Sequence, residues 1–333
     1  MKKIKFIDLF CGIGGFRIAL ENAAKNAGLE TECVFSSDID KYCQISYLKN
    51  FGEKPYGDIT EVNASTVPEH DILLAGFPCQ AFSIMGEMKG FDDTRGTLFF
   101  DIARIIKEKK PSYFVLENVK QLKGHDKGKT LQVIIKTLSD LGYDVSYKIL
   151  NALNFGLPQK RERIWIVGSL NGLNMFQFPQ GNPQYPIIDD FLIDEELIPA
   201  NYFASEYIRN KRKQAYKGIQ TKNTTIWHEN KSGNISALPY SCALRAGASH
   251  NYLLVNGIRR LLPRELLRLQ GFPDSYKIVV SDSQCRKQAG NSLPVNTAQA
   301  VISELLKLDL INENTKIANS RKIQASLSIE QVS

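Results

Sequence analysis

The first half of the chain alternates short apolar runs with longer amphipathic stretches. Apolar runs of strand length occupy residues 4–9, 33–36, 71–75, 112–116, 144–150 and 164–168. Apolar positions repeat with helical spacing in residues 14–27, 41–50, 96–109 and 128–141. Runs such as 71–75 do not alternate with polar residues, as expected for strands covered on both faces. This order predicts an α/β fold with a doubly wound, mostly parallel sheet.

The pattern changes after about residue 170. Residues 171–200 are rich in Asn, Gly, Gln and Pro and end in an acidic run, which indicates a linker. Residues 201–285 are weakly periodic apart from a predicted helix at 263–270, and a strongly apolar helix is predicted at 294–308. We therefore expect a first domain over 1–175, a second, smaller irregular domain over 176–285, and a C-terminal segment over 286–333 that returns to the first domain.

Charge is distributed unevenly along the 333 residues. The net charge is +7, but residues 201–290 hold 15 Lys and Arg against 5 Asp and Glu, so the rest of the chain sums to −3. A basic segment attached to a slightly acidic one favours a nucleic-acid partner. An ordinary lysine-rich surface is the alternative.

Several classes of protein are disfavoured. No apolar run reaches the roughly 18 residues of a membrane span, so we expect a cytoplasmic protein with no membrane association. The six cysteines form no C-x-x-C pair and only four histidines are present, so we expect free thiols and no metal.

Polar groups follow two of the predicted strands, where the carboxyl ends of a parallel sheet gather ligands. Cys79 comes after the run at 71–75, and Glu117-Asn118 comes after the run at 112–116. A charged cluster at 159–163 leads directly into the last predicted strand. Cys79 is therefore a candidate nucleophile with a carboxylate and cations nearby. A buried structural thiol, a capping Glu and a solvated charge run are the alternatives.

The first predicted strand leads into a glycine turn, Phe10-Cys11-Gly12-Ile13-Gly14-Gly15. This turn lets the backbone approach a ligand closely, but it departs from the G-x-G-x-x-G pyrophosphate pattern. Asp38 is suited to ribose hydroxyls and Asp58 to an adenine amine, with helix caps or turn residues as the alternatives. A nucleoside site without a phosphate clamp favours S-adenosylmethionine over NAD.

Six motifs together resemble those of the cytosine-C5 DNA methyltransferases, particularly the bacterial modification enzymes. In the family's order they are Phe10-x-Gly12-x-Gly14-Gly15, Pro78-Cys79-Gln80, Glu117-Asn118-Val119, Gln159-x-Arg161-x-Arg163, Arg260-x-x-Pro263-Arg264-Glu265 with Gly271-Phe272-Pro273, and Gly290-Asn291-Ser292. The resemblance covers residues 4–168 and 259–306. It implies a Rossmann-like, S-adenosylmethionine-dependent methyltransferase with a smaller DNA-recognition domain.

The resemblance also implies catalytic roles. Cys79 would attack C6 of a flipped-out cytosine, Glu117 would hold or protonate N3, and Asn118 would orient the Glu117 carboxylate. Arg163 would bind the base carbonyl or hold Glu117, with Arg161 nearby. The implied cofactor-binding residues are Phe10, Gly12, Gly14, Asp38, Ile39, Asp58, Ile59, Pro78, Asn291 and Ser292.

DNA contacts are expected from two segments. The first resembles the family's mobile loop and includes Gln80, Ser83, Met85 and Arg95, with Ser83 a candidate phosphate contact and Met85 a candidate to fill the gap left by the base. The second lies in residues 201–258, outside the resemblance. Its candidates for reading base edges are Arg245, Ser249, His250 and Asn251, and phosphate contact or loop structure is the alternative.

The predicted function is methyl transfer from S-adenosylmethionine to C5 of a cytosine in a specific duplex DNA sequence. We expect a monomer that protects host DNA beside a restriction endonuclease. A tRNA cytosine-5 methyltransferase and a non-catalytic, cofactor-binding DNA regulator are alternatives. A nicotinamide oxidoreductase is opposed by the incomplete glycine pattern and by the basic segment.

Overall fold

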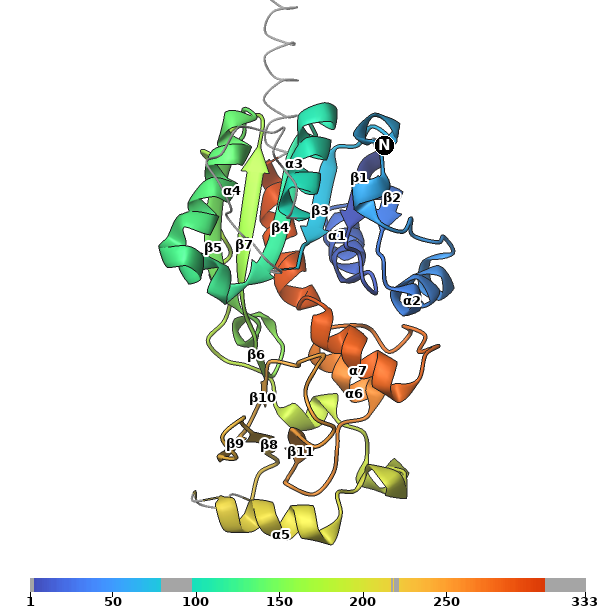
Figure 1. Ribbon diagram of the computed structural model, residues 1–333, viewed down its shortest axis with the longest axis vertical. Helices are drawn as coiled ribbons and strands as arrows, with labels where there is room; N and C mark the ends of the chain where they lie inside the picture. The colour runs from blue at the N-terminus through green and yellow to red at the C-terminus, as the bar shows by residue number, and fades with distance from the viewer. Residues whose placement is uncertain (1–2, 79–97, 217, 219–221, 309–333) are drawn as a thin grey trace, which may run out of the picture.

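The computed structural model describes residues 3–78, 98–216, 218 and 222–308, and a six-stranded sheet forms its centre (Figure 1). The strands lie in the order β2-β1-β3-β4-β7-β5, and within this sheet only β7 runs antiparallel to its neighbours. The predicted α/β fold with a mostly parallel sheet is confirmed. Its strands are β1 (Lys3–Leu9), β2 (Glu30–Ser37), β3 (Ile72–Gly76), β4 (Tyr113–Val119), β5 (Asp144–Asn151) and β7 (Glu162–Ser169).

Helices cover both faces of the sheet because its central strands bury side chains on both sides. Along β3, Ile72 and Leu74 belong to one apolar core, and Leu73 and Ala75 belong to the other. α1 (Gly15–Asn26) and the helix at 295–308 pack into the first core. α3 (Leu98–Lys109) and α4 (Lys129–Asp140) pack into the second. This arrangement is the doubly wound one that the alternating pattern predicts.

Below the sheet in Figure 1 lies a second lobe, defined here as residues 188–291. Its antiparallel sheet orders β11 (Leu253–Val255), β8 (Ile226–Glu229) and β9 (Ile235–Leu238). α5 (Glu206–Ala215) lies at the far end, whereas α6 (Pro263–Leu269) and α7 (Asp282–Asn291) lie toward the large sheet. The lobe holds more regular structure than its weak periodicity indicates.

Segments from before and after the predicted linker at 171–200 pair with each other. β6 (Gln159–Lys160) pairs in parallel with β10 (Ser241–Cys242), so the segment before β7 is part of the framework of the second lobe. Residues of α1, α6, α7 and the helix at 295–308 also belong to one continuous apolar core. The domain boundaries at 175 and 285 stay predictions.

The remaining helices are short or peripheral. Within the described ranges no helix is long and apolar enough to cross a membrane. No group of three or more His, Cys, Asp and Glu among the described residues is placed to hold a metal ion. The remaining elements are α2 (Lys41–Phe51) and the 3-10 helices η1 (Ile59–Glu61), η2 (Ala64–Thr66), η4 (Lys120–Gly128), η5 (Ala152–Phe155), η6 (Ile188–Phe191), η7 (Glu195–Leu197) and η8 (Ala200–Tyr202).

Candidate active site

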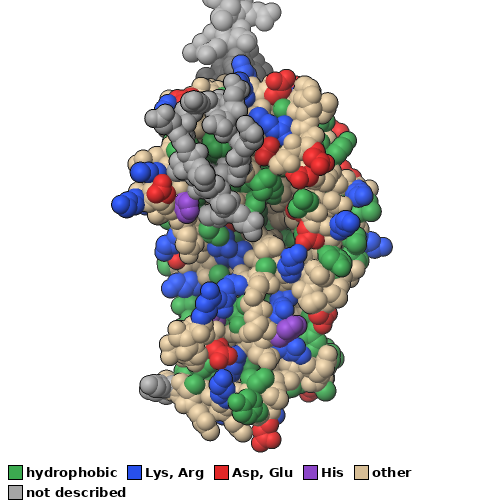
Figure 2. Space-filling view, in the orientation of Figure 1, with side chains coloured by type: hydrophobic (Ala, Val, Ile, Leu, Met, Phe, Trp, Pro, Cys, Tyr) green, Lys and Arg blue, Asp and Glu red, His purple; other side chains and the backbone are tan. Residues whose placement is uncertain are grey.

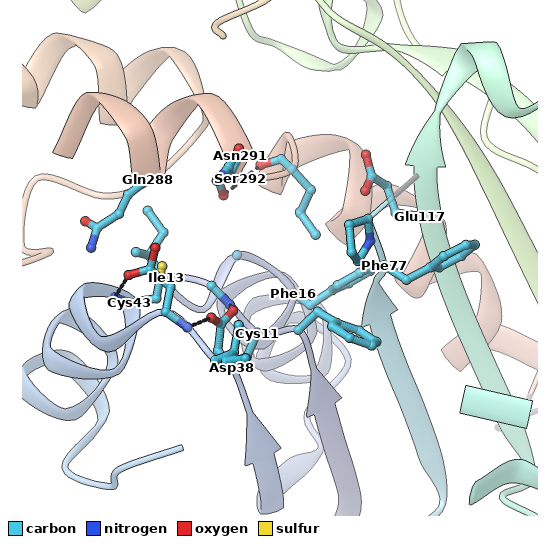
Figure 3. Close-up of a pocket in the computed structure, with 18 of the residues that line it drawn as sticks. Cys11, Ile13, Phe16, Asp38, Cys43, Phe77, Glu117, Gln288, Asn291 and Ser292 are labelled. Carbon is cyan, nitrogen blue, oxygen red and sulfur yellow. Dashed lines mark hydrogen bonds between the residues drawn. The ribbon is translucent and has the colours of Figure 1, made fainter. Parts of the chain in front are cut away.

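A cavity of about 550 Å³ opens at the carboxyl ends of β1 to β4, with α7 on its other side (Figure 3). Figure 3 shows Asp38 and Glu117 on different sides of this cavity, with Asn291 and Ser292 at the end of α7. The structure thus brings predicted cofactor and catalytic residues together from distant parts of the chain. Those that line the cavity are Phe10, Gly12, Asp38, Ile39, Asp58, Ile59, Pro78, Glu117, Asn118, Arg161, Arg163, Asn291 and Ser292.

The turn between β1 and α1 adopts left-handed backbone conformations. Phe10, Gly12 and Gly14 have φ angles of 55°, 53° and 83°. Gly14 is not among the described residues that line the cavity, which differs from the prediction. A Cβ on Gly14 would lie 2.3 Å from the ring of Phe51, so its glycine permits close packing of α1 on α2.

Asp38 supports this turn from the end of β2. Its Oδ2 accepts a hydrogen bond from the Gly12 N–H at 2.8 Å, and its Oδ1 accepts one from the Asp40 N–H at 2.8 Å. Burial raises the pKa of the Asp38 carboxyl, although these two backbone N–H groups oppose the shift. Each carboxylate oxygen keeps a second lone pair. Asp38 is therefore placed both to fix the turn and to accept a hydroxyl from a ligand in the cavity.

Asp58 and Ile39 lie at the edge of the cavity. Asp58 begins η1, where its Oδ1 accepts hydrogen bonds from the Thr60 N–H at 2.9 Å and the Thr60 hydroxyl at 2.8 Å. This is the turn role considered as the alternative, and it leaves Oδ2 available. The Ile39 side chain is 71% exposed, which leaves its apolar surface available to a ligand.

Glu117 lies near the carboxyl end of β4, next to the antiparallel strand β7. Arg163 at the start of β7 places its Nε 2.8 Å from Glu117 Oε1, and only 11% of the Glu117 side chain is exposed. Burial raises the pKa of the Glu117 carboxyl, and the charges of Arg163 and Arg161 only partly oppose it. Of the two roles predicted for Arg163, the structure shows the one that holds Glu117. A buried acid with a raised pKa is suited to proton transfer.

Asn118 has a different role from the predicted one. Its Nδ2 donates to the Phe77 carbonyl at 2.8 Å, and its Oδ1 accepts from the Val119 N–H at 2.8 Å. Successive side chains of a strand point to opposite faces of the sheet, so the Asn118 side chain is directed away from the Glu117 carboxylate. Asn118 therefore fixes the backbone just before Pro78 rather than orienting the Glu117 carboxylate.

Arg161 is a buried residue that lines the cavity and ties distant segments together. Only 1% of it is exposed, and its guanidinium donates to the carbonyls of Leu244 at 2.9 Å, Gly290 at 3.0 Å, and Ser292. Burial lowers the pKa of Arg161 to about 9, helped by the charge of Arg163 and opposed by that of Glu117. The cluster at 159–163 is thus a junction between lobes, and not a solvated charge run.

Comparison with known proteins decides the family. The family model of C-5 cytosine-specific DNA methylases matches residues 4–307. The chain belongs to this family. It is 53% identical over 310 residues to the type II methyltransferase M.HaeII of Haemophilus aegyptius, covering 92% of this chain and 94% of that protein. It is also 53% identical to M.NgoBI of Neisseria gonorrhoeae, covering 89% of this chain and 91% of that protein.

One more distant sequence relative and one solved structure also match. M.HhaI of Haemophilus parahaemolyticus is 44% identical and covers 90% of this chain and 93% of its own length. The crystal structure of the S. pombe Dnmt2 methyltransferase superimposes with a TM-score of 0.69 at 22% identity, covering 92% of this chain and 99% of that one, which shows a common fold. The chain is an enzyme of the cytosine-C5 methyltransferase family, as its motifs predict.

The loop at 243–252 of the methyltransferase packs on the turn at the end of α7. A Cβ on Gly290 would lie 2.3 Å from the Ala246 nitrogen and 2.6 Å from the Arg245 carbonyl carbon. Gln159, fully buried, accepts from the Leu244 N–H at 3.0 Å and donates to the Leu269 carbonyl at 2.7 Å. The base of this loop is therefore held against the cofactor-side turn.

The candidate base-reading residues of this loop differ in their surroundings. Ser249 and His250 are exposed, and His250 Nε2 lies 3.4 Å from Arg286 Nη2. Arg245 lies over the Tyr252 ring at 4.9 Å, and its Nη2 is 3.4 Å from His228 Nε2. Asn251 is half-buried, and its carbonyl accepts from Arg212.

Five predicted residues lie outside the described part of the chain: Cys79, Gln80, Ser83, Met85 and Arg95. Sequence reasoning missed two cavity residues on α7, Lys287 and Gln288. Lys287 Nζ lies 2.7 Å from Asp40 Oδ2, and Gln288 bonds the Ser46 hydroxyl. Their position just before the Gly290-Asn291-Ser292 motif was the sequence signal that could have placed them in the cavity.

Proposed function

We propose that this methyltransferase transfers a methyl group from S-adenosylmethionine to C5 of a flipped-out cytosine in a specific sequence of duplex DNA. The observation that carries the proposal is Glu117, a buried acid held by Arg163 in the same cavity as Asp38 and Asp58. The likeness to type II methyltransferases supports a role beside a restriction endonuclease. The proposed enzyme acts in the cytoplasm as a monomer.

The residues on the nucleoside side of the cavity fit S-adenosylmethionine. Asp38 and Asp58 each keep an oxygen lone pair toward a ligand, and Phe10 and Ile39 supply apolar surface beside them. Two carboxylates at this position would repel a pyrophosphate, and the nearby Lys287 is already paired with Asp40. Asn291 and Ser292 line the opposite part of the cavity. S-adenosylmethionine, when bound, supplies an electrophilic methyl group.

The proposed chemistry begins with Cys79. Its thiolate forms a bond to C6 of cytosine, and the electron pair of the C5–C6 double bond is displaced into the ring while N3 takes a proton from Glu117. The resulting enamine carbon C5 would take the methyl group that S-adenosylmethionine supplies, and S-adenosylhomocysteine would leave. Solvent water then takes the C5 proton, which restores the double bond and expels the thiolate, and N3 returns its proton to Glu117. Arg163 keeps the carboxyl of Glu117 in place throughout.

Duplex DNA is the proposed substrate because of the charge on the second lobe. Lys and Arg side chains gather at the middle of the face drawn in Figure 2, between the two lobes. Residues 201–290 carry the whole cationic surplus of the chain. A cationic surface supplies the sequence-independent part of DNA affinity.

Methylation mapping tests the proposal. We expect DNA from cells that express the enzyme to keep unconverted cytosines in one fixed sequence context after chemical conversion. Cys79→Ala should abolish them, whereas the control Cys33→Ala, on β2 outside the cavity lining, should retain them. Glu117→Gln should slow transfer by about 10²–10⁴-fold. Labelled methyl in tRNA but not in duplex DNA would establish the tRNA alternative, and full activity of Cys79→Ala would refute the mechanism.

A further inference from the structure

A second cavity, of about 120 Å³, lies in the second lobe and shares no lining residue with the cofactor cavity. It is bounded by the segment at 201–202, the loop at 250–253, residues 260–266 and the first turns of α7. Three basic side chains line it: His250, Arg260 and Arg286. The site mechanism above uses none of them.

Arg286 is half-buried on α7 and has unused hydrogen-bonding capacity. Its Nε and Nη1 are buried and have no hydrogen-bond partner among the described residues. Its Nη2 lies 3.4 Å from His250 Nε2. A neutral His250 imidazole can accept a hydrogen bond from Arg286 Nη2, whereas a protonated imidazole cannot and would be repelled by the guanidinium.

The other charged groups of the cavity are already engaged. The Arg260 guanidinium lies over the Tyr202 ring at 5.2 Å and donates to the Asn201 carbonyl. Asp282, the carboxylate that lines the cavity, accepts the Tyr202 hydroxyl. The charged and titratable groups that line the cavity are thus one carboxylate, which already has a partner, two guanidinium groups and an imidazole. The cavity therefore has a cationic surplus.

We propose that this cavity binds one phosphodiester of the DNA backbone, with the Arg286 guanidinium as the main donor and Arg260 and His250 beside it. A guanidinium presents its donors in a fork that matches phosphate oxygens. The inference rests on the proposed DNA substrate. Because His250 belongs to the loop that also carries Arg245 and Ser249, this contact would fix the register of the loop on the duplex without reading a base.

Binding measured across salt concentration tests the proposal. Arg286→Gln should weaken binding to a cognate duplex and to an unrelated duplex by the same factor, and it should reduce the slope of log K against log salt by about 0.9, the value for one phosphate. Its melting temperature and cofactor binding should match the parent. The control Lys136→Gln removes a cation that is 71% exposed on α4 and should leave the slope unchanged.

A second measurement identifies the phosphate. Duplexes with a neutral methylphosphonate at one position after another should show one position where the parent enzyme loses affinity and Arg286→Gln does not. Equal sensitivity of both proteins at every position would overturn the site, as would an unchanged salt slope. A loss confined to the cognate duplex would assign Arg286 to base reading instead. A parent enzyme that binds tRNA but no duplex DNA would refute the proposed function itself.

Discussion

Replacing Arg163 by Gln should make the stability of the protein fall steeply as pH rises, because it removes the counter-ion of the buried Glu117. The Nε–Oε1 distance is 2.8 Å, which places the two charge centres about 4 Å apart. At an effective dielectric constant of about 20 the lost attraction is about 4 kcal/mol. The pKa of Glu117, already raised by burial, should rise further because the charge that opposes this shift is removed.

The sign follows from proton binding. Below the ordinary carboxyl pKa, Glu117 is protonated in the folded and unfolded states, and the variant carries no charge penalty. Between that value and the raised pKa of the folded state, the folded protein holds a proton that the unfolded chain has lost. Unfolding free energy then falls by about 1.4 kcal/mol per pH unit until the folded-state pKa is reached. The parent loses less because its pKa is raised less.

Urea unfolding from pH 5 to pH 8.5 measures this difference. Arg163→Gln should be close to the parent at the acidic end and up to about 4 kcal/mol less stable at the basic end. In a Glu117→Gln background the same substitution should show no such slope. Lys120→Gln, which opens the exposed pair with Glu162, is the matched control and should cost under about 1 kcal/mol at any pH. Parallel pH curves for the parent and Arg163→Gln would refute the electrostatic reasoning.

Three further substitutions separate packing, burial and protonation. Gly290→Ala should weaken cofactor and DNA binding together, since its Cβ would overlap the Ala246 backbone at 2.3 Å; titration of each ligand checks this, and loss of only one contradicts it. Asp8→Asn should raise the melting temperature at pH 8 more than at pH 5, because burial raises the pKa of a carboxyl whose oxygens have no hydrogen-bond partner among the described residues. The DNA affinity of the parent should increase between pH 8 and pH 6, and His250→Gln should remove this increase. The charge of Arg286 lowers the pKa of His250, and a bound phosphate would favour the imidazolium; Arg260 and Asp282 are the other charged groups of the cavity. A parent affinity that does not change with pH would contradict this prediction.

The large sheet was predictable because its strands are recognisable from local runs of apolar residues in the sequence. β3 and β4 are continuous apolar runs between turn residues, and the helices between strands repeat with helical spacing. Polar residues placed after these runs, such as Asp38 and Glu117, therefore converge on one cavity by topology alone. Their position at strand ends could be read without knowing any long-range contact.

The second lobe was not predictable in this way. β8, β9 and β11 are three or four residues long, and their pairing depends on partners across the lobe. The roles expected for Asn118 and Arg161 came from the family resemblance, which does not give the contacts of individual side chains. Asn118 bonds the Phe77 carbonyl and Arg161 bonds carbonyls at 244, 290 and 292, contacts that only the folded chain brings together.

Arg161 links the loop at 243–252 to the turn at the end of α7. A buried guanidinium loses its hydration, and here three backbone carbonyls accept from Nη1 and Nη2, whereas the buried Nε has no hydrogen-bond partner among the described residues. Two of those carbonyls belong to the turn beside the cofactor cavity, and the third belongs to the loop at 243–252. Any displacement of that loop relative to the turn would leave part of a buried charge without a partner. The orientation of the loop toward the cofactor cavity is therefore fixed by the protein, before any substrate is bound.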